Sequence, residues 1–145
     1  MKMHMKHFGF VFAALCGAAF FAHAQDTTST VSAMTGVYTQ AQADEGVKVY
    51  HASCDEGCHL YRLEGYGRAK PLKGDGFKQD WKGKTLAELF QFISVKMPQD
   101  FPATLTPEEY VNVMAYVLSQ NGFPAGTKPL TGDATALAGI VFADE

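Results

Sequence analysis

Residues 54–59 read CDEGCH, so two thiols lie about one helical turn apart and a histidine directly follows the second. The thiols of Cys54 and Cys58 can each add to one vinyl group of a haem, and the imidazole of His59 can bind the iron. The usual attachment signature has two residues between its cysteines, whereas this chain has three. The stretch therefore predicts a covalently bound haem c, held by a motif one residue longer than usual.

Cysteines four positions apart still share one face of a helix. Gly57 can adopt a local bulge, so we expect the extra residue to be looped out while both thiols reach their vinyl groups. Attachment through one cysteine alone is the alternative for a motif of this length. A structural Cys54–Cys58 disulfide competes poorly, because it would close a very short loop and constrain the unfolded chain little.

Residues 1–24 predict a secretory signal peptide. Two lysines precede an apolar run over residues 8–21, and residues 22–24 read AHA, a small-x-small cleavage site. The apolar run is shorter than the roughly 20 residues that span a bilayer. We therefore expect cleavage after Ala24, loss of Cys16 with the signal, and a periplasmic mature protein.

The mature chain would have 121 residues, enough for one domain with a modest core. Its ten basic residues face fifteen acidic ones, so the formal net charge falls from −3 to −5. This balance argues against nucleic-acid binding, which needs clustered Lys and Arg. It fits a protein that is steered towards a basic patch on its partner.

Three main helices and long loops are predicted, because no run of alternating apolar residues indicates a sheet. The helix starts are marked by capping threonines at Thr39, Thr85 and Thr106, and the ends are expected near residues 52, 96 and 121. Residues 60–84 contain five glycines and indicate a loop around a bulky object. The sequence thus predicts an all-α fold.

The two ends of the mature chain are expected to lack helices. Residues 25–38 are rich in Ser and Thr and predict a flexible leader. Residues 123–145 predict a mostly extended tail. The domain expected to fold around the haem is therefore residues 39–145.

Five side chains are candidates for the second axial ligand of the iron: Met34, His51, Lys96, Met97 and Met114. Met114 falls on the core face of the last predicted helix, Met34 lies in the expected leader, and His51 lies too close to the cysteines. Met97 lies between two helices and is followed by proline, so its thioether is on a loop. We therefore predict His59 and Met97 as the axial ligands.

An ordered series of short segments along nearly the whole mature chain carries a family resemblance. Its members are residues 38–42, Gly46, Tyr50, residues 71–74, Phe77, Trp81, Gly83, residues 85–86, residues 97–98, residues 115–118, residues 121–122 and residues 124–126. Together with the cysteine motif, this series resembles the class I c-type cytochromes. More narrowly, it is similar to the single-haem cytochromes associated with bacterial quinoprotein dehydrogenases. The resemblance implies a small cytochrome c fold around one haem.

The resemblance also implies how this fold is held together. The first and last helices would cross at Gly46, with Tyr50 and Tyr116 packed nearby. Trp81 would line the haem edge or bond a propionate, although a plain core tryptophan is equally compatible with the sequence.

Around the iron, the resemblance implies His59 and Met97 on opposite sides. The free ring N–H of His59 would donate to a main-chain carbonyl near Lys70, a bond that tunes the iron. Relatives often carry proline in place of Lys70 and glycine in place of Leu60. Leu60 restricts the backbone directly after the histidine.

These features predict a periplasmic electron carrier that is not an enzyme. No nucleophile–base pair or phosphate-binding loop is recognisable, and an iron with six ligands leaves no open position for a substrate. The resemblance implies a dehydrogenase, possibly a quinoprotein, as the electron donor and a respiratory oxidase or another cytochrome as the acceptor.

Two other functions remain open. A copper-binding protein could use the soft ligands that copper prefers, and the sequence offers a set for it: His51, Cys54, Cys58, His59 and Met97. Copper proteins with this cysteine spacing use β-rich scaffolds, which this sequence does not predict. A haem-free structural subunit derived from a cytochrome is the other alternative.

Overall fold

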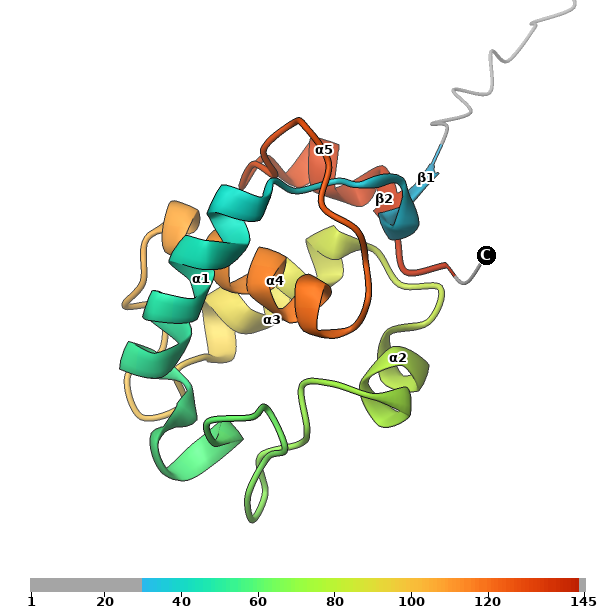
Figure 1. Ribbon diagram of the computed structural model, residues 1–145. Helices are drawn as coiled ribbons and strands as arrows, with labels where there is room; N and C mark the ends of the chain where they lie inside the picture. Colours follow the sequence, from blue (N-terminus) through green and yellow to red (C-terminus); the bar gives the residue numbers. More distant parts are fainter. Residues whose placement is uncertain (1–29, 144–145) are drawn as a thin grey trace, which may run out of the picture.

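The computed structural model describes residues 30–143, and helices make up its frame (Figure 1). The longer helices are α1 (Gln40–Ser53), α3 (Leu86–Lys96) and α4 (Pro107–Gln120). The other elements are short: helices α2 (Asp75–Trp81) and α5 (Ala134–Ala138), strands β1 (Val31–Ser32) and β2 (Ile140–Val141), and the turns η1 (Ala33–Thr35) and η2 (Asp55–His59). The all-α fold expected from the sequence is confirmed. The predicted signal peptide lies outside the described residues.

Each long helix begins at the threonine cap predicted for it. The side chains of Thr39, Thr85 and Thr106 accept a hydrogen bond from the backbone N–H three residues further on. The Gln or Glu at that position accepts one from the N–H of the cap in return. Such reciprocal bonds satisfy N–H groups that a helix start leaves unpaired, and losing a cap costs about 1 kcal/mol.

Helices α1 and α4 pack against each other (Figure 1). Their closest approach involves Gly46, as the resemblance implied. A Cβ atom on Gly46 would collide with the backbone carbonyl of Asn112. Only glycine lets two helix backbones approach this closely. Beside the contact, the rings of Tyr50 and Tyr116 pack with their centroids 5.3 Å apart.

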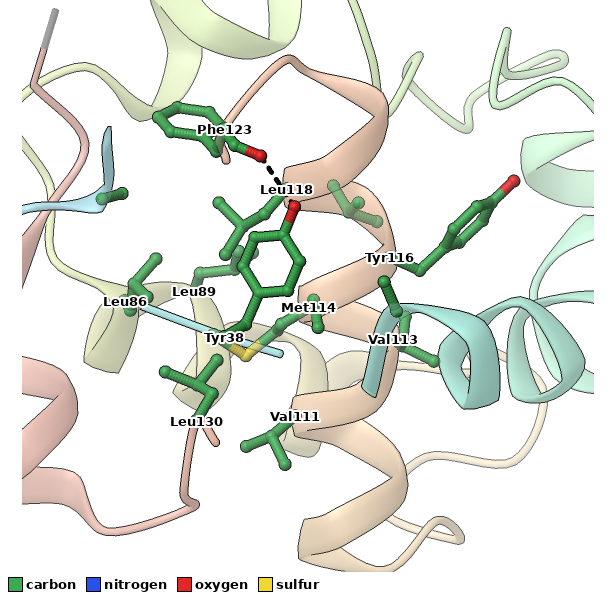
Figure 2. Packing of buried hydrophobic residues seen from close by; sticks show 14 of the residues in the cluster. Tyr38, Leu86, Leu89, Val111, Val113, Met114, Tyr116, Leu118, Phe123 and Leu130 are labelled. Carbon is green, nitrogen blue, oxygen red and sulfur yellow. Dashed lines mark hydrogen bonds between the residues drawn. The ribbon is translucent and has the colours of Figure 1, made fainter. Parts of the chain in front are cut away.

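Helix α4 lies at the centre of the core, since residues 110–118 are all buried. Figure 2 shows Met114 packed among apolar side chains from other parts of the chain, including Leu86 and Leu130. The hydroxyl of Tyr38 donates to the carbonyl of Phe123 at 2.7 Å. The segments that precede α1 and follow α4 are thereby tied to the same core.

The expected leader, residues 25–38, lies partly outside the described residues, and its described part, residues 30–38, contains β1 and η1. Strand β1 pairs in parallel with β2 near the other end of the chain, and Ala33 and Tyr38 are buried. The Ser32 hydroxyl accepts a hydrogen bond from the backbone N–H of Met34 and so starts η1. The apolar anchors of this segment outweigh its Ser and Thr content, a balance that composition alone does not reveal.

Two short helices were absent from the expectation. Helix α2 interrupts the expected loop over residues 60–84, and its start has no side-chain cap. Buried Phe77 holds it against the core instead. Helix α5 interrupts the expected extended tail, with Asp133 as its cap and Leu137 fully buried. Tertiary burial stabilises both helices, which is why local sequence signals missed them.

Within residues 30–143, none of the helices combines the length and the apolar composition needed to span a membrane.

Candidate functional site

The CDEGCH stretch continues α1 as the wider turn η2. His59 N–H donates to the Cys54 carbonyl at 3.0 Å, and Leu60 N–H donates to the Asp55 carbonyl at 2.9 Å. Both bonds reach back five residues instead of the four of an α-helix, a spacing that accommodates one extra residue. Gly57 takes φ +71°, outside the helical range. The bulge expected at Gly57 is therefore present.

Two neighbouring residues at the end of α1 hold η2 on both sides. The Tyr50 hydroxyl donates to the carbonyl of Leu60 at 2.6 Å, directly after the turn. The His51 Nδ1 atom lies 2.7 Å from a carboxylate oxygen of Asp55, at the start of the turn. Burial raises the pKa of Tyr50 well above its usual value, so its hydroxyl remains a donor.

The imidazole of His59 is held by the following loop. Its Nδ1 atom lies 2.9 Å from the backbone carbonyl oxygen of Lys70. Since a carbonyl oxygen only accepts, Nδ1 must carry the proton, and Nε2 keeps its lone pair free. Burial lowers the pKa of His59, partly offset by this hydrogen bond, which favours a neutral imidazole. The main-chain partner implied by the resemblance is the one observed.

Gly65 shapes the loop that presents this carbonyl. Its N–H donates to the His59 carbonyl at 3.0 Å, and it takes φ +72°. A Cβ atom there would collide with the backbone around Ala69, Lys70 and Pro71. The loop therefore folds back on itself at Gly65 and delivers the Lys70 carbonyl to His59.

Leu60 occupies a backbone region that non-glycine residues rarely adopt, with φ +58° and ψ 164°. The restriction expected from a leucine after the histidine thus takes the form of local strain. The hydrogen bonds of Tyr50 to the Leu60 carbonyl and of Leu60 to Asp55 hold it there.

Cys54 and Cys58 are free thiols and are both half-buried. Burial raises the pKa of Cys54 to about 11, with smaller contributions from the negative charges of Asp55 and Cys58. Cys54 therefore carries its proton at neutral pH. A protonated thiol is a weak ligand for a metal ion, because the thiolate is the form that binds metals.

Met97 ends α3 and begins the connection to α4. Its carbonyl accepts a hydrogen bond from the Tyr110 hydroxyl at 2.7 Å, and the peptide bond to Pro98 is cis. The Met97 side chain is half-buried. Among residues 30–143, no hydrogen bond, ion pair or ring contact joins Met97 directly to η2.

The other candidate ligands have different surroundings. Met114 is 1% exposed within the core, and Met34 packs against that core from η1. His51 pairs with Asp55 and stacks on Tyr61, with ring centroids 4.5 Å apart. Lys96 is exposed at the end of α3.

Trp81 packs in an aromatic cluster, with Phe77, Phe92 and Phe142 around it and Lys84 over its ring. Trp81 is partly buried and packs against the edge of the core. The copper alternative gains no support from the part of the chain that the structure describes, where no three His, Cys, Asp or Glu side chains gather around a possible metal position.

The donor set of η2 fits a haem c. Two unpaired thiols lie in one turn with a neutral imidazole whose Nε2 is free, and the half-buried thioether of Met97 lies on a separate loop. The sequence analysis did not identify the roles of Tyr50 or Asp55 in holding the turn. The role of Asp55 had one signal in the sequence, its i, i+4 spacing from His51.

Comparison with known proteins agrees with this chemistry. The family described as cytochrome c oxidase, cbb3-type, subunit III matches residues 41–117, more than half of the chain. No curated protein and no solved structure matches the chain. The matched range includes all of α1 but its first residue, η2, the loop with Lys70, Met97 and most of α4. The chain therefore belongs to this family and is a c-type cytochrome, a protein that transfers electrons through covalently bound haem c.

Proposed function

We propose that this chain is a periplasmic electron carrier with one haem c, attached through both Cys54 and Cys58 and bound axially by His59 and Met97. It would pass electrons one at a time and catalyse no reaction of its own. A bound haem c supplies a single iron that alternates between the ferric and ferrous states. The observation that carries the proposal is η2, which absorbs the extra residue while His59 keeps Nε2 free.

The chemistry of attachment is a simple addition. Each Cys S–H adds across one vinyl group, the sulfur bonding to one carbon and the hydrogen to the other, with no net oxidation. Both thiols are free to take part in this addition, since no disulfide joins Cys54 to Cys58. Gly57 adopts the positive φ of the bulge between Cys54 and Cys58.

The choice of Met97 as second axial ligand rests on the surroundings of the candidates. Met114 is committed to the core and His51 to Asp55, whereas Met97 is half-buried at a helix end. The bond from Tyr110 to the Met97 carbonyl anchors the backbone of that residue. A thioether ligand favours the ferrous state and so raises the reduction potential.

The partners are proposed from the family and the resemblance. The family description names a subunit of a respiratory oxidase, which favours an oxidase as the electron acceptor. A dehydrogenase, possibly a quinoprotein, is proposed as the donor on the resemblance alone. Export to the periplasm rests on the signal-peptide pattern of residues 1–24.

The first experiment is a pyridine haemochrome spectrum of the protein purified from the periplasm of a host that attaches haem. We expect the band of a two-thioether haem c, with a mass increase of one haem per chain. A one-thioether band would reject the two-cysteine part of the proposal. A chain without haem would reject the proposal and favour the haem-free subunit.

The axial ligand is tested by Met97→Ala, with Met34→Leu as the matched control. Met97→Ala should lower the reduction potential and let ferrous iron bind carbon monoxide, while Met34→Leu should leave both unchanged. If Met97→Ala keeps the parent spectrum and potential, Met97 is not the ligand.

A further inference from the structure

The His51–Asp55 pair joins the last turn of α1 to the first residue of the long motif. His51 Nδ1 lies 2.7 Å from Asp55 Oδ2, and the side chains are 28% and 17% exposed. A charged or hydrogen-bonded pair that is mostly shielded from water holds its geometry better than an exposed one. The pair reaches across Cys54, the first attachment residue.

His51 is itself held in place from two sides. Its ring stacks on Tyr61, with centroids 4.5 Å apart and an angle of 16° between the planes. The ring of Tyr50 meets it edge-on at 5.5 Å. Tyr61 follows η2 and Tyr50 precedes it, so the stack links both sides of the turn. Because the His51 ring is confined in this way, it can hold the Asp55 side chain in place through their hydrogen bond.

A longer turn has more ways to fold than a shorter one. Of the three residues between the cysteines, Asp55 pairs with His51, and Glu56 and Gly57 leave the helical conformation. Among the described residues, Glu56 has no hydrogen-bond or ion-pair partner, and a Cβ on Gly57 would meet nothing within 4 Å. The bulge is therefore confined to Glu56 and Gly57, because Asp55 is fixed.

We infer that His51 and Asp55 are positioning residues that confine the bulge of the C-x3-C-H motif, so that Cys54 and Cys58 are presented together for haem attachment. The inference rests on the proposed function. It assigns the pair a role that arises only because the motif is one residue too long. A motif with two residues between its cysteines would have no bulge to confine.

The test compares His51→Ala in two backgrounds, the natural motif and a motif shortened by deletion of Glu56. All variants are expressed with the haem-attachment system, and the readouts are the haem content by intact mass and the one- or two-thioether band of the pyridine haemochrome. In the natural motif, His51→Ala should lower two-thioether attachment by about threefold or more, as loss of a shielded hydrogen bond implies. In the shortened motif the same substitution should have no further effect.

Two matched variants separate positioning from general stability. Glu56→Ala changes an exposed side chain of the same turn and should attach haem like the natural chain. His51→Gln keeps an N–H donor and should restore most of the attachment, even if the alanine variant is degraded. Asp55→Ala should reproduce His51→Ala, and the double variant should be no worse than either alone.

Three results would overturn the inference. The first is unchanged two-thioether attachment in both His51→Ala and Asp55→Ala. The second is an equal loss in the shortened motif, which would mark a general structural role. The third is a His51→Gln variant as defective as the alanine variant. A natural chain without any haem would instead reject the proposed function, and the inference with it.

Discussion

The α1–α4 crossing and the η2 turn both depend on a glycine, but for opposite reasons. Gly46 is buried where a side chain would collide with the Asn112 carbonyl. Gly57 lies in open space and is needed for its φ of +71°. The crossing is therefore specified by tight packing over two long helices, whereas the turn is specified by backbone conformation and a few hydrogen bonds. Changes at the crossing should affect the whole fold, and changes at the turn should mainly affect haem attachment.

The largest effect is expected from Gly46→Ala. A methyl group at this position would push two helix backbones apart, so we expect a loss of about 4 kcal/mol or more of unfolding free energy. Denaturant unfolding of the haem-loaded protein, followed by circular dichroism, measures it. Gly76→Ala is the control, because the corresponding Cβ in α2 meets nothing within 4 Å. Similar stabilities of the two variants would contradict the crossing.

Gly65→Ala should come second. The substitution places a side chain at a positive φ, where its Cβ atom would collide with the loop backbone that carries the Lys70 carbonyl. We expect the free energy of unfolding to fall by about 2–3 kcal/mol. Since the His59 hydrogen bond depends on that carbonyl, the reduction potential should shift as well. Gly67→Ala shares the positive φ but meets nothing within 4 Å, so it isolates the cost of conformation. Equal behaviour of the two variants in unfolding and potentiometry would show that the close contact is unimportant.

Tyr50→Phe should have a smaller effect, confined to the turn. It removes the hydroxyl that donates to the Leu60 carbonyl but keeps the ring that packs on Tyr116. We expect the free energy of unfolding to fall by about 1–2 kcal/mol. Hydrogen exchange of the η2 amides should accelerate more than that of α4. Tyr61→Phe is the matched control, since Tyr61 is 71% exposed and its ring is retained on His51. Uniform acceleration over both regions would mean that the turn and the crossing unfold together.

Leu60→Gly should give the smallest effect, with the opposite sign. Glycine adopts φ +58° and ψ 164° freely, so relief of strain should outweigh the lost side-chain contacts and stabilise the fold by up to about 1 kcal/mol. Ala103 is exposed and has a φ of 59°, so Ala103→Gly measures the relief of backbone strain without the loss of a large side chain. Thermal unfolding of both variants measures the change. A destabilised Leu60→Gly beside a stabilised Ala103→Gly would show that the Leu60 side chain matters more than its backbone.

The sequence was most informative where the physics is local. Capping threonines predicted the starts of α1, α3 and α4, because a cap and the N–H group that it binds lie only three residues apart. The bulge at Gly57 was also predicted, because the spacing of the cysteines and the presence of glycine are both visible in six residues. Strand β1 was not predicted, because it depends on pairing with β2 more than a hundred residues away.

By itself, the sequence determined the helical frame, the glycine at its crossing and the spacing of the thiol and imidazole side chains in residues 54–59. Only the tertiary structure decided how these parts are held. It shaped the loop at Gly65, and it brought the Tyr50 hydroxyl to the Leu60 carbonyl and the Tyr110 hydroxyl to the Met97 carbonyl. Each of these bonds joins a side chain to a carbonyl whose position depends on the course of a loop. A carbonyl is common to every residue type, so residue identity carries no mark of which carbonyl becomes the partner of Tyr50 or of Tyr110.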